Sequence, residues 1–220
     1  GCALMASGES ERFAAFNKWA IENGGDMGAL RVGKGAYGVG GIASRDVSPG
    51  DTIAAIPYSL ILSTAVAEAS PIGVAAAAWR AKQPPSIARK LPPRAVMYAF
   101  MVAQRHEGTP SSPAGAGGGS GVHWGPYLRL VPTLGELAES MPVCWDEERV
   151  DEQLGGTNLG PTILTRQDQL RAMHSTMVRA LRESKVAAVH DVASVLTYDA
   201  FLWAHCVFAS RGFPTRLGSP

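Results

Sequence analysis

The sequence predicts an α+β chain, with a small twisted β-sheet near the N-terminus followed by a large, wholly helical region. Short apolar, partly β-branched segments around a turn occupy the first part, where the apolar period is close to two. From Ser63 onward the alanine content rises and apolar residues recur with a helical period. The 220 residues, 46% hydrophobic and 18% charged, are enough for a sizeable globular core.

The net charge and the spacing of the cysteines argue against several kinds of ligand and site. A formal net charge of +1 gives no reason to expect a nucleic acid or an anionic membrane. The three cysteines are far apart and form no CxxC pair, and no HExxH pattern occurs, so we expect neither a metal site nor a disulfide framework. No apolar run approaches the roughly 18 residues of a membrane span.

The first part of the chain reads as a helix followed by short strands. Glu9–Asn23 carries an apolar stripe at helical spacing and ends at Gly24. Ser48-Pro49-Gly50-Asp51 is a turn in which Pro fixes φ and Gly supplies the left-handed position. We predict three strands of one small sheet, with a glycine loop before the second: Leu30–Val32, Gly41–Val47 and Thr52–Ile56.

Two glycine patterns in this part approach nucleotide-binding motifs. Gly28 to Lys34 has the spacing of a phosphate loop, but Gly35 follows where Ser or Thr would bind magnesium. Gly38 to Ala43 has the spacing of a dinucleotide fingerprint, but Pro49 and Gly50 interrupt any helix after it. A nucleotide-binding α/β protein and a glycine-rich turn without a ligand both stay open as alternatives.

The second part reads as helices joined by breaks. Pro71 interrupts the first helix, Thr197 is a candidate N-cap of the last, and Thr109–Gly121 is expected to be a flexible, functionally neutral surface loop. His174 reads as a structural histidine, and Trp124 with Tyr127 as core packing. We predict helices over Ala65–Ala81, Pro93–His106, Asp146–Leu154, Thr165–Val189 and the segment after Thr197.

Several of these segments together resemble one family. Gly38–Val47 followed by Pro49-Gly50-Asp51 and a strand ending at Pro57 resembles the opening of a SET domain, in the branch of the Rubisco large-subunit methyltransferase and its actin-histidine and lysine methyltransferase relatives. Gly41 departs from the pattern, which usually has Leu there. Further matches are Trp19 with Asn23-Gly24, the segment from Trp124 to Pro132, Leu154 to Thr157, and the run from Thr197 through Ser210-Arg211 to Phe213.

The resemblance implies a split SET domain and a protein methyltransferase. It implies an N-terminal helix over residues 1–27, the N-terminal part of the SET domain over 28–64, a helical insert over 65–196, and a helix over 197–220 that returns to the SET domain. It also implies S-adenosyl-L-methionine as cofactor, a protein substrate with lysine favoured over histidine as the acceptor, and no metal. It does not distinguish cytoplasm, nucleus and plastid as the intracellular location.

The resemblance also implies four cofactor-binding residues. The backbone of Tyr37, Gly38 and Val39 would contact the cofactor, and the guanidinium of Arg211 would face its carboxylate, a geometry that Arg meets bidentately. We therefore expect this backbone and Arg211 to lie on one concave surface. The alternative for Arg211 is that it only caps the last carbonyl groups of its helix.

The sequence also departs from the family in one large respect. After the Ser-Arg-x-Phe segment the family has a strand, an Asn-His pair that grips the cofactor and an active-site tyrosine, and none of these follows Phe213. We therefore expect an incomplete chain that is inactive by itself, and we assign no catalytic residue. The alternative function is a non-catalytic protein-interaction module derived from a SET protein, with the helical insert as its binding surface.

Overall fold

The chain divides into two compact units, each of which is described by itself. A computed structural model describes residues 2–36, 38–106 and 123–213, with side chains from residue 11 onward. Unit 1 comprises Gly1–Leu62 and Val122–Val131, and unit 2 comprises Ser63–Gly121 and Pro132–Pro220. Tyr37 and the loop expected at Thr109–Gly121 lie outside the described residues.

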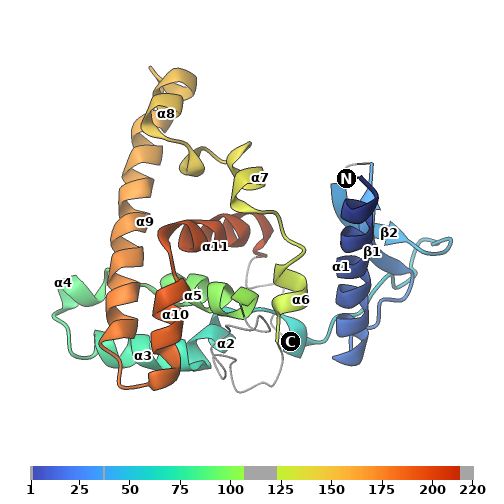
Figure 1. Cartoon of the computed structure of the whole chain (residues 1–220), viewed down its shortest axis with the longest axis horizontal. Helices are drawn as coiled ribbons and strands as arrows, with labels where there is room; N and C mark the ends of the chain where they lie inside the picture. The colour runs from blue at the N-terminus through green and yellow to red at the C-terminus, as the bar shows by residue number, and fades with distance from the viewer. Residues whose placement is uncertain (1, 37, 107–122, 214–220) are drawn as a thin grey trace. The chain divides into compact units, whose positions relative to one another are not determined.

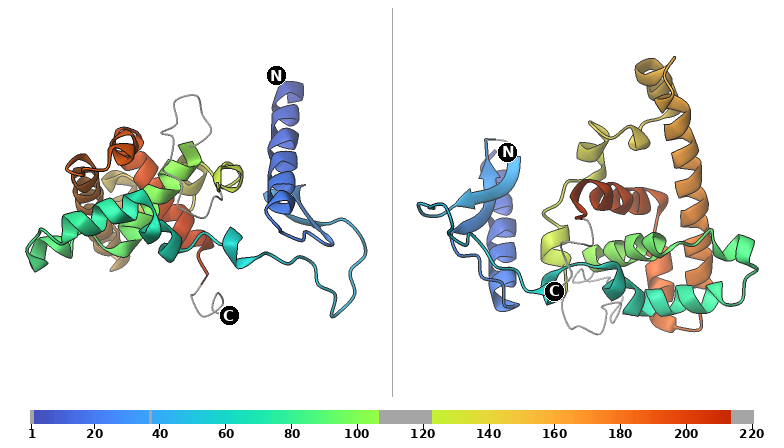
Figure 2. Two further views of the ribbon diagram at one scale, coloured as in Figure 1. Left: turned by 90° about the horizontal axis from the view of Figure 1, so that it is seen from below. Right: turned by 180° about the vertical axis from the view of Figure 1, so that it is seen from behind.

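Unit 1 is a helix with a two-stranded hairpin beside it, as Figures 1 and 2 show. The indole Nε1 of Trp124 donates a hydrogen bond to the Leu60 carbonyl at 3.0 Å, and the ring of Tyr127 meets that of Phe16. The segment 123–131 therefore packs within this unit, with Trp124 buried as expected and Tyr127 only partly buried. The elements are α1 (Cys2–Glu22), β1 (Leu30–Gly35), β2 (Gly38–Ala43), the 3-10 helix η1 (Tyr58–Leu60) and α6 (Gly125–Leu128).

The sheet is smaller than the sequence predicts. β1 and β2 pair antiparallel with Leu30 opposite Ala43, so the predicted glycine loop is itself a strand. The prediction of a strand over Gly41–Val47 is wrong beyond Ala43, because the chain leaves the ladder there. The prediction of a strand over Thr52–Ile56 is wrong as well. That segment is extended, but it pairs only through the Asp26–Ala55 bridge and the 3.0 Å bond from the Ala29 amide to the Ile53 carbonyl.

Unit 2 is entirely helical in its described residues, so the α+β class with a small sheet and a helical region is confirmed. In Figure 1, α9 runs the length of the unit, and α5 packs against both α9 and α11. The elements are α2 (Thr64–Ala69), α3 (Pro71–Arg80), α4 (Pro85–Ala88), α5 (Pro93–His106), α7 (Leu134–Ala138), η2 (Pro142–Cys144), α8 (Glu147–Leu154), α9 (Leu159–Arg182), η3 (Ala187–Val189), α10 (His190–Val195) and α11 (Tyr198–Arg211).

Helix α5 is the centre of this unit. Its bounds match the prediction, and burial is not limited to one apolar face: every residue from Ala95 to Gln104 is buried. A helix that is buried all round needs neighbours on every side, and α2, α3, α9, α10 and α11 all pack against α5. On the side of α11, the ring of Tyr98 meets the ring of Phe201 edge-on with a centroid distance of 5.3 Å.

Side-chain caps explain where several helices begin. The hydroxyl of Thr197 accepts a hydrogen bond from the Ala200 amide, which confirms Thr197 as the N-cap of α11. Asp146 caps α8 in the same way, and Thr133 forms a reciprocal capping box with Glu136 at α7. Because these side chains satisfy amides that a helix start leaves open, the boundaries follow from local sequence.

Two helix boundaries differ from the prediction. The alanine-rich stretch is two helices, because Ser70 caps α3 and Pro71 occupies its first turn. The long helix spans Leu159–Arg182 and not Thr165–Val189. It ends early because the Ser184 hydroxyl accepts from the Val186 amide and the Ser184 carbonyl bonds to the ring of His190, which turns the chain toward η3.

The sharp junction between α2 and α3 generates a stability prediction. A Cβ at Gly73 would overlap the backbone carbonyl of Glu68. We expect Gly73→Ala to lower the free energy of unfolding by about 2 kcal/mol, because the two helices must move apart. Gly135→Ala in α7 is the matched control, since a Cβ there meets nothing within 4 Å. Urea denaturation followed by circular dichroism checks both; equal effects of the two variants would contradict this account of the junction.

Candidate functional site

One face of the β1–β2 hairpin carries four glycines near its tip, and the space over Gly33 is filled by the side chains of Ile42 and Arg31. Gly33 lies opposite Gly40 and Gly35 lies opposite Gly38, and residues paired in this way point to the same face of a sheet. A Cβ at Gly38 or Gly40 would meet nothing within 4 Å among the described residues. Gly38 has φ +96°, a conformation that glycine adopts readily. The backbone of β2 is therefore open to close approach on this face.

The opposite face of the hairpin explains the departure at Gly41. A Cβ at Gly41 would lie 2.7 Å from Cδ1 of Leu30, so the side chain of Leu30 fills the space over this glycine. The resembled pattern has Leu at position 41, whereas in this chain the leucine comes from the neighbouring strand. Of the predicted site residues, Gly38 and Val39 thus lie in β2, with Val39 51% exposed, and Tyr37 lies outside the described residues.

Asn17 holds the hairpin against α1. Its side-chain oxygen accepts from the Val32 amide at 3.0 Å, and its nitrogen donates to the carbonyls of Val32 at 3.2 Å and Phe13 at 2.8 Å. One amide therefore bonds both backbone groups of a residue in β1 while also bonding the helix. Sequence reasoning missed this residue, because an Asn in the middle of a helix has no local signature for a contact 15 positions away.

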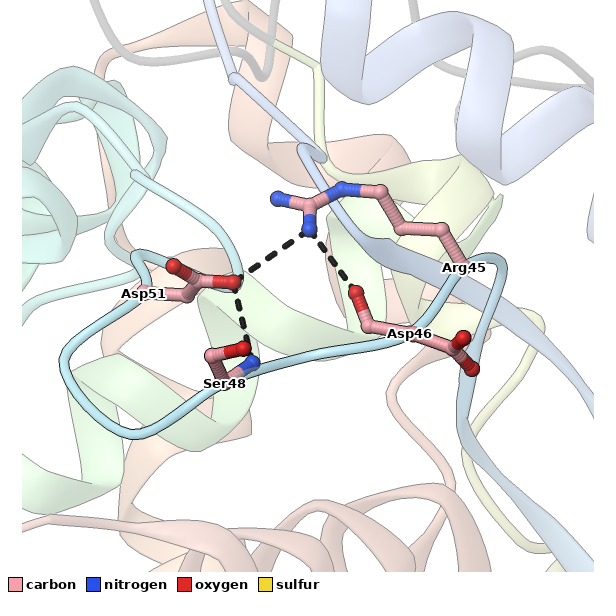
Figure 3. A network of polar contacts seen from close by, with 4 residues as sticks. All are labelled: Arg45, Asp46, Ser48 and Asp51. Atoms are coloured by element: carbon pink, nitrogen blue, oxygen red, sulfur yellow. Dashed lines mark hydrogen bonds and ion pairs between the residues drawn. The ribbon is translucent and has the colours of Figure 1, made fainter.

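A charged network closes the turn that follows β2 (Figure 3). Nη1 of Arg45 donates to the Asp46 carbonyl at 2.9 Å and to Oδ2 of Asp51 at 3.3 Å, and that same carboxylate oxygen accepts from the Ser48 amide at 3.0 Å. The Asp51 amide in turn bonds the Ser48 carbonyl, with Gly50 at φ +92°. The turn predicted at residues 48–51 is confirmed as a type II turn.

Arg211 is the last residue of α11, in unit 2. Its Nη1 donates to the Ser210 hydroxyl at 2.8 Å, and that hydroxyl donates to the Cys206 carbonyl at 2.7 Å. The side chain is exposed and forms no ion pair with a carboxylate within the described part of unit 2. The Ser210 hydroxyl thus bonds both a carbonyl in the last turns of the helix and one nitrogen of the exposed guanidinium. Because the hairpin belongs to the other unit, a site shared with Arg211 stays a prediction.

A buried polar pair between α5 and α11 escaped the sequence analysis. The hydroxyl of Tyr98 lies 3.0 Å from Nδ1 of His205, and both side chains are buried. Burial, together with the nearby positive charges of Arg166 and Arg94, lowers the pKa of His205 to about 4. Burial likewise raises the pKa of Tyr98. His205 is therefore neutral at pH 7. His174 has a structural contact as well, since its Nε2 bonds the Leu196 carbonyl at 2.8 Å.

Other kinds of site find little support in the described residues. A surface depression of about 580 Å³ lies between α8 and the start of α9, lined by Glu148, Asp151 and Gly156 among others, but by none of the predicted site residues. In the same residues, no group of three or more His, Cys, Asp or Glu side chains is arranged to hold a metal ion. No single described helix passes as a membrane span; the sharply bent pair Ala187–Val195 and Tyr198–Arg211 does so on length and composition alone.

A curated protein and a solved structure show what this chain is similar to. The human protein "SET domain-containing protein 4" is 26% identical over 184 residues, which cover 81% of this chain and 35% of that protein. The solved structure described as Rubisco LSMT bound to AdoMet superposes with a TM-score of 0.63 at 21% identity, covering 94% of this chain and 41% of that one. No family model matches. The chain thus spans well under half the length of each relative.

The contacts of Asn17 generate a prediction for the hairpin. Asn17→Asp replaces a donor with a carboxylate oxygen that faces two carbonyl oxygens. We expect amide exchange across residues 30–43 to accelerate about tenfold or more, since unsatisfied groups of this kind cost roughly 1–3 kcal/mol. Asn158→Asp at the N-cap of α9 makes the same chemical change where a negative charge is favourable. Unchanged exchange in Asn17→Asp would contradict the role of this side chain.

The pKa of His205 generates a pH prediction. Between about pH 6.5 and pH 4 the unfolded imidazole binds a proton that the folded one does not, so stability is present above pH 6.5 and is lost as the pH falls. We expect the loss from this group to approach roughly 3 kcal/mol near pH 4. Denaturation across this range, compared with His205→Gln, isolates the contribution. An equal pH dependence in both proteins would show that His205 titrates normally in the folded state.

Proposed function

We propose that this chain contributes the cofactor-binding hairpin and the helical region of an S-adenosyl-L-methionine-dependent protein methyltransferase of the SET-domain type, to which its relatives point. The single observation that carries the proposal is the glycine face of the hairpin, open at Gly38 and Gly40. The relatives support the domain type, and the open backbone at Gly38 and Gly40 supports a ligand contact at the hairpin.

The hairpin suits the cofactor for two reasons. Without side chains at Gly38 and Gly40, a ligand can lie against the backbone itself. In addition, β2 pairs only with β1 among the described residues, so the backbone groups along its outer edge are free to bond a polar ligand. We assign these contacts to Tyr37, Gly38 and Val39.

Arg211 is assigned to the carboxylate of the cofactor. Its guanidinium bonds Ser210 and is exposed at the end of a well-buried helix. A planar fork of this kind binds a carboxylate through two parallel hydrogen bonds. The proposal requires that Arg211 and the glycine face line one concave surface in the working protein.

The proposed reaction transfers a methyl group to a side-chain nitrogen of a protein, with lysine as the acceptor. The cofactor supplies an activated methyl group, and no metal is needed. The residues of this chain would hold that group in line with a neutral amine and exclude water, so that positioning and desolvation provide most of the rate enhancement. No residue of the chain is assigned as catalytic.

The cofactor site is tested by titrating the isotopically labelled 220-residue chain with S-adenosyl-L-methionine and following backbone NMR signals. We expect shifts at Gly38–Gly40 and Arg211 that saturate only at millimolar concentrations. The assigned residues contact part of the ligand, and each missing polar contact costs about 1 kcal/mol or more. Calorimetric titration should therefore show no micromolar binding, and labelled cofactor should transfer no methyl group to protein substrates.

Gly40→Val is the decisive variant. Its side chain points into open space and does not require a left-handed backbone, so the fold is kept while the ligand's space is filled. We expect it to abolish the shifts, whereas Gly135→Ala leaves them intact. Shifts elsewhere, or none at millimolar cofactor, would contradict the site and favour a non-catalytic interaction module. Micromolar affinity or turnover would show that other residues form the site.

A further inference from the structure

Two of the three cysteines meet in the helical unit although they are 62 positions apart. Cys144 ends η2 and Cys206 lies in the middle of α11, with their Sγ atoms 3.3 Å apart. Both are free thiols. A disulfide bond is about 2.05 Å long, so a small adjustment of the two side chains would bring the sulfur atoms to bonding distance.

The surroundings of Cys144 hold it in this position. The side-chain amide of Gln167, on α9, donates to the Val143 carbonyl at 3.2 Å and to the Trp145 carbonyl at 2.6 Å. These bonds fix the backbone on both sides of Cys144. The side chain itself is half-buried, which leaves it within reach of a small molecule from solvent.

Cys206 is held even more firmly. The residue is fully buried, as are Trp203 and Val207 on the same helix, which packs against α5, α7 and α9. Its carbonyl accepts the hydroxyl of Ser210, so the last turns of α11 are tied to it. Because both ends of the pair are anchored, the sulfur atoms stay close without a bond between them.

The two thiols are chemically unequal. The hydrogen bond from Cys206 lowers the pKa of Cys144, while that same bond, together with burial, raises the pKa of Cys206. Cys144 is thus the more acidic and more accessible sulfur, and the thiolate is the form that reacts with oxidants. This asymmetry separates an attacking thiol from a resolving one.

We propose that Cys144 and Cys206 form a reversible disulfide when the chain meets a hydroperoxide. The Cys144 thiolate attacks one peroxide oxygen, the O–O bond breaks, and the products are a sulfenic acid and hydroxide. The Cys206 sulfur then attacks the sulfenic sulfur, an S–S bond forms, and water leaves. Overall, two thiols and hydrogen peroxide give one disulfide and two water molecules. A small dithiol reverses the bond by exchange.

The disulfide would link η2 covalently to α11 within unit 2. It closes a loop over the 62 positions between the two residues, and this cross-link lowers the conformational entropy of the unfolded chain. The oxidised form should therefore unfold at a temperature higher by about 5 °C or more. The proposal does not depend on methyl transfer, since it concerns only contacts inside the helical unit.

The test uses the full chain carrying Cys2→Ser, which leaves these two thiols alone. After treatment with hydrogen peroxide, the remaining thiols are alkylated and trypsin fragments are weighed. We expect residues 130–149 linked to residues 186–211, a higher melting temperature, and return of both properties to the starting values with dithiothreitol. Two free thiols after peroxide, or a linked form with an unchanged melting temperature, would overturn the proposal.

Two single variants, and a measurement in concentrated urea, test the separate roles of the two thiols. In Cys206→Ser, Cys144 has no resolving partner, so we expect a sulfenic acid that dimedone traps; in Cys144→Ser we expect no trapping at Cys206 and no melting shift. In concentrated urea the pair loses its proximity, and disulfide formation should slow several-fold. Equal rates in urea and in buffer, or dimedone labelling of Cys206 in preference to Cys144, would contradict the roles assigned to the two thiols.

Discussion

Helix α5 is buried along ten consecutive residues, and the arrangement of the helical unit follows from that burial. A helix without a solvent face cannot be stable alone, because its apolar surface must be covered on all sides. The neighbouring helices supply this cover, and α11 supplies the most specific part of it. Tyr98 meets Phe201 and Phe208 edge-on and bonds His205, so the contact is defined in geometry as well as in area.

The same helix α11 connects packing to chemistry. Its first half fills the space beside α5, Cys206 in its middle meets Cys144, and its last residue is Arg211. The Ser210 hydroxyl lies between the last two, with hydrogen bonds to both. A change that loosens α11 would therefore act on the stability of the unit, on the thiol pair and on the guanidinium together.

The hairpin in unit 1 differs from the helical unit, in which large buried side chains determine the arrangement. Its proposed function depends on side chains that are absent, since Gly38 and Gly40 leave the backbone open. A two-stranded hairpin with four glycines near its tip buries little by itself and is marginal in water. Polar contacts therefore hold the hairpin where apolar burial is small. Asn17 bonds it to α1, and the Arg45 network fixes the turn after β2.

Local features of this protein could be derived from the sequence alone. The bounds of α5 at Pro93, the cap at Thr197 and the turn at residues 48–51 depend on residues a few positions apart, and each was predicted correctly. The resemblance carried by the glycine pattern and the Ser-Arg-x-Phe segment indicated the fold type for the same reason, because those motifs are contiguous.

Only the tertiary structure decided the contacts between distant segments. Thr52–Ile56 is extended as its sequence favours, yet it borders residues 26–29 and joins no sheet, because strand pairing depends on partners and not on propensity. Three contacts join residues 15 to 107 positions apart: Asn17 with Val32, Tyr98 with His205, and Cys144 with Cys206. No local pattern encodes them, because they arise from how helices pack, and packing is determined by the whole set of buried surfaces at once.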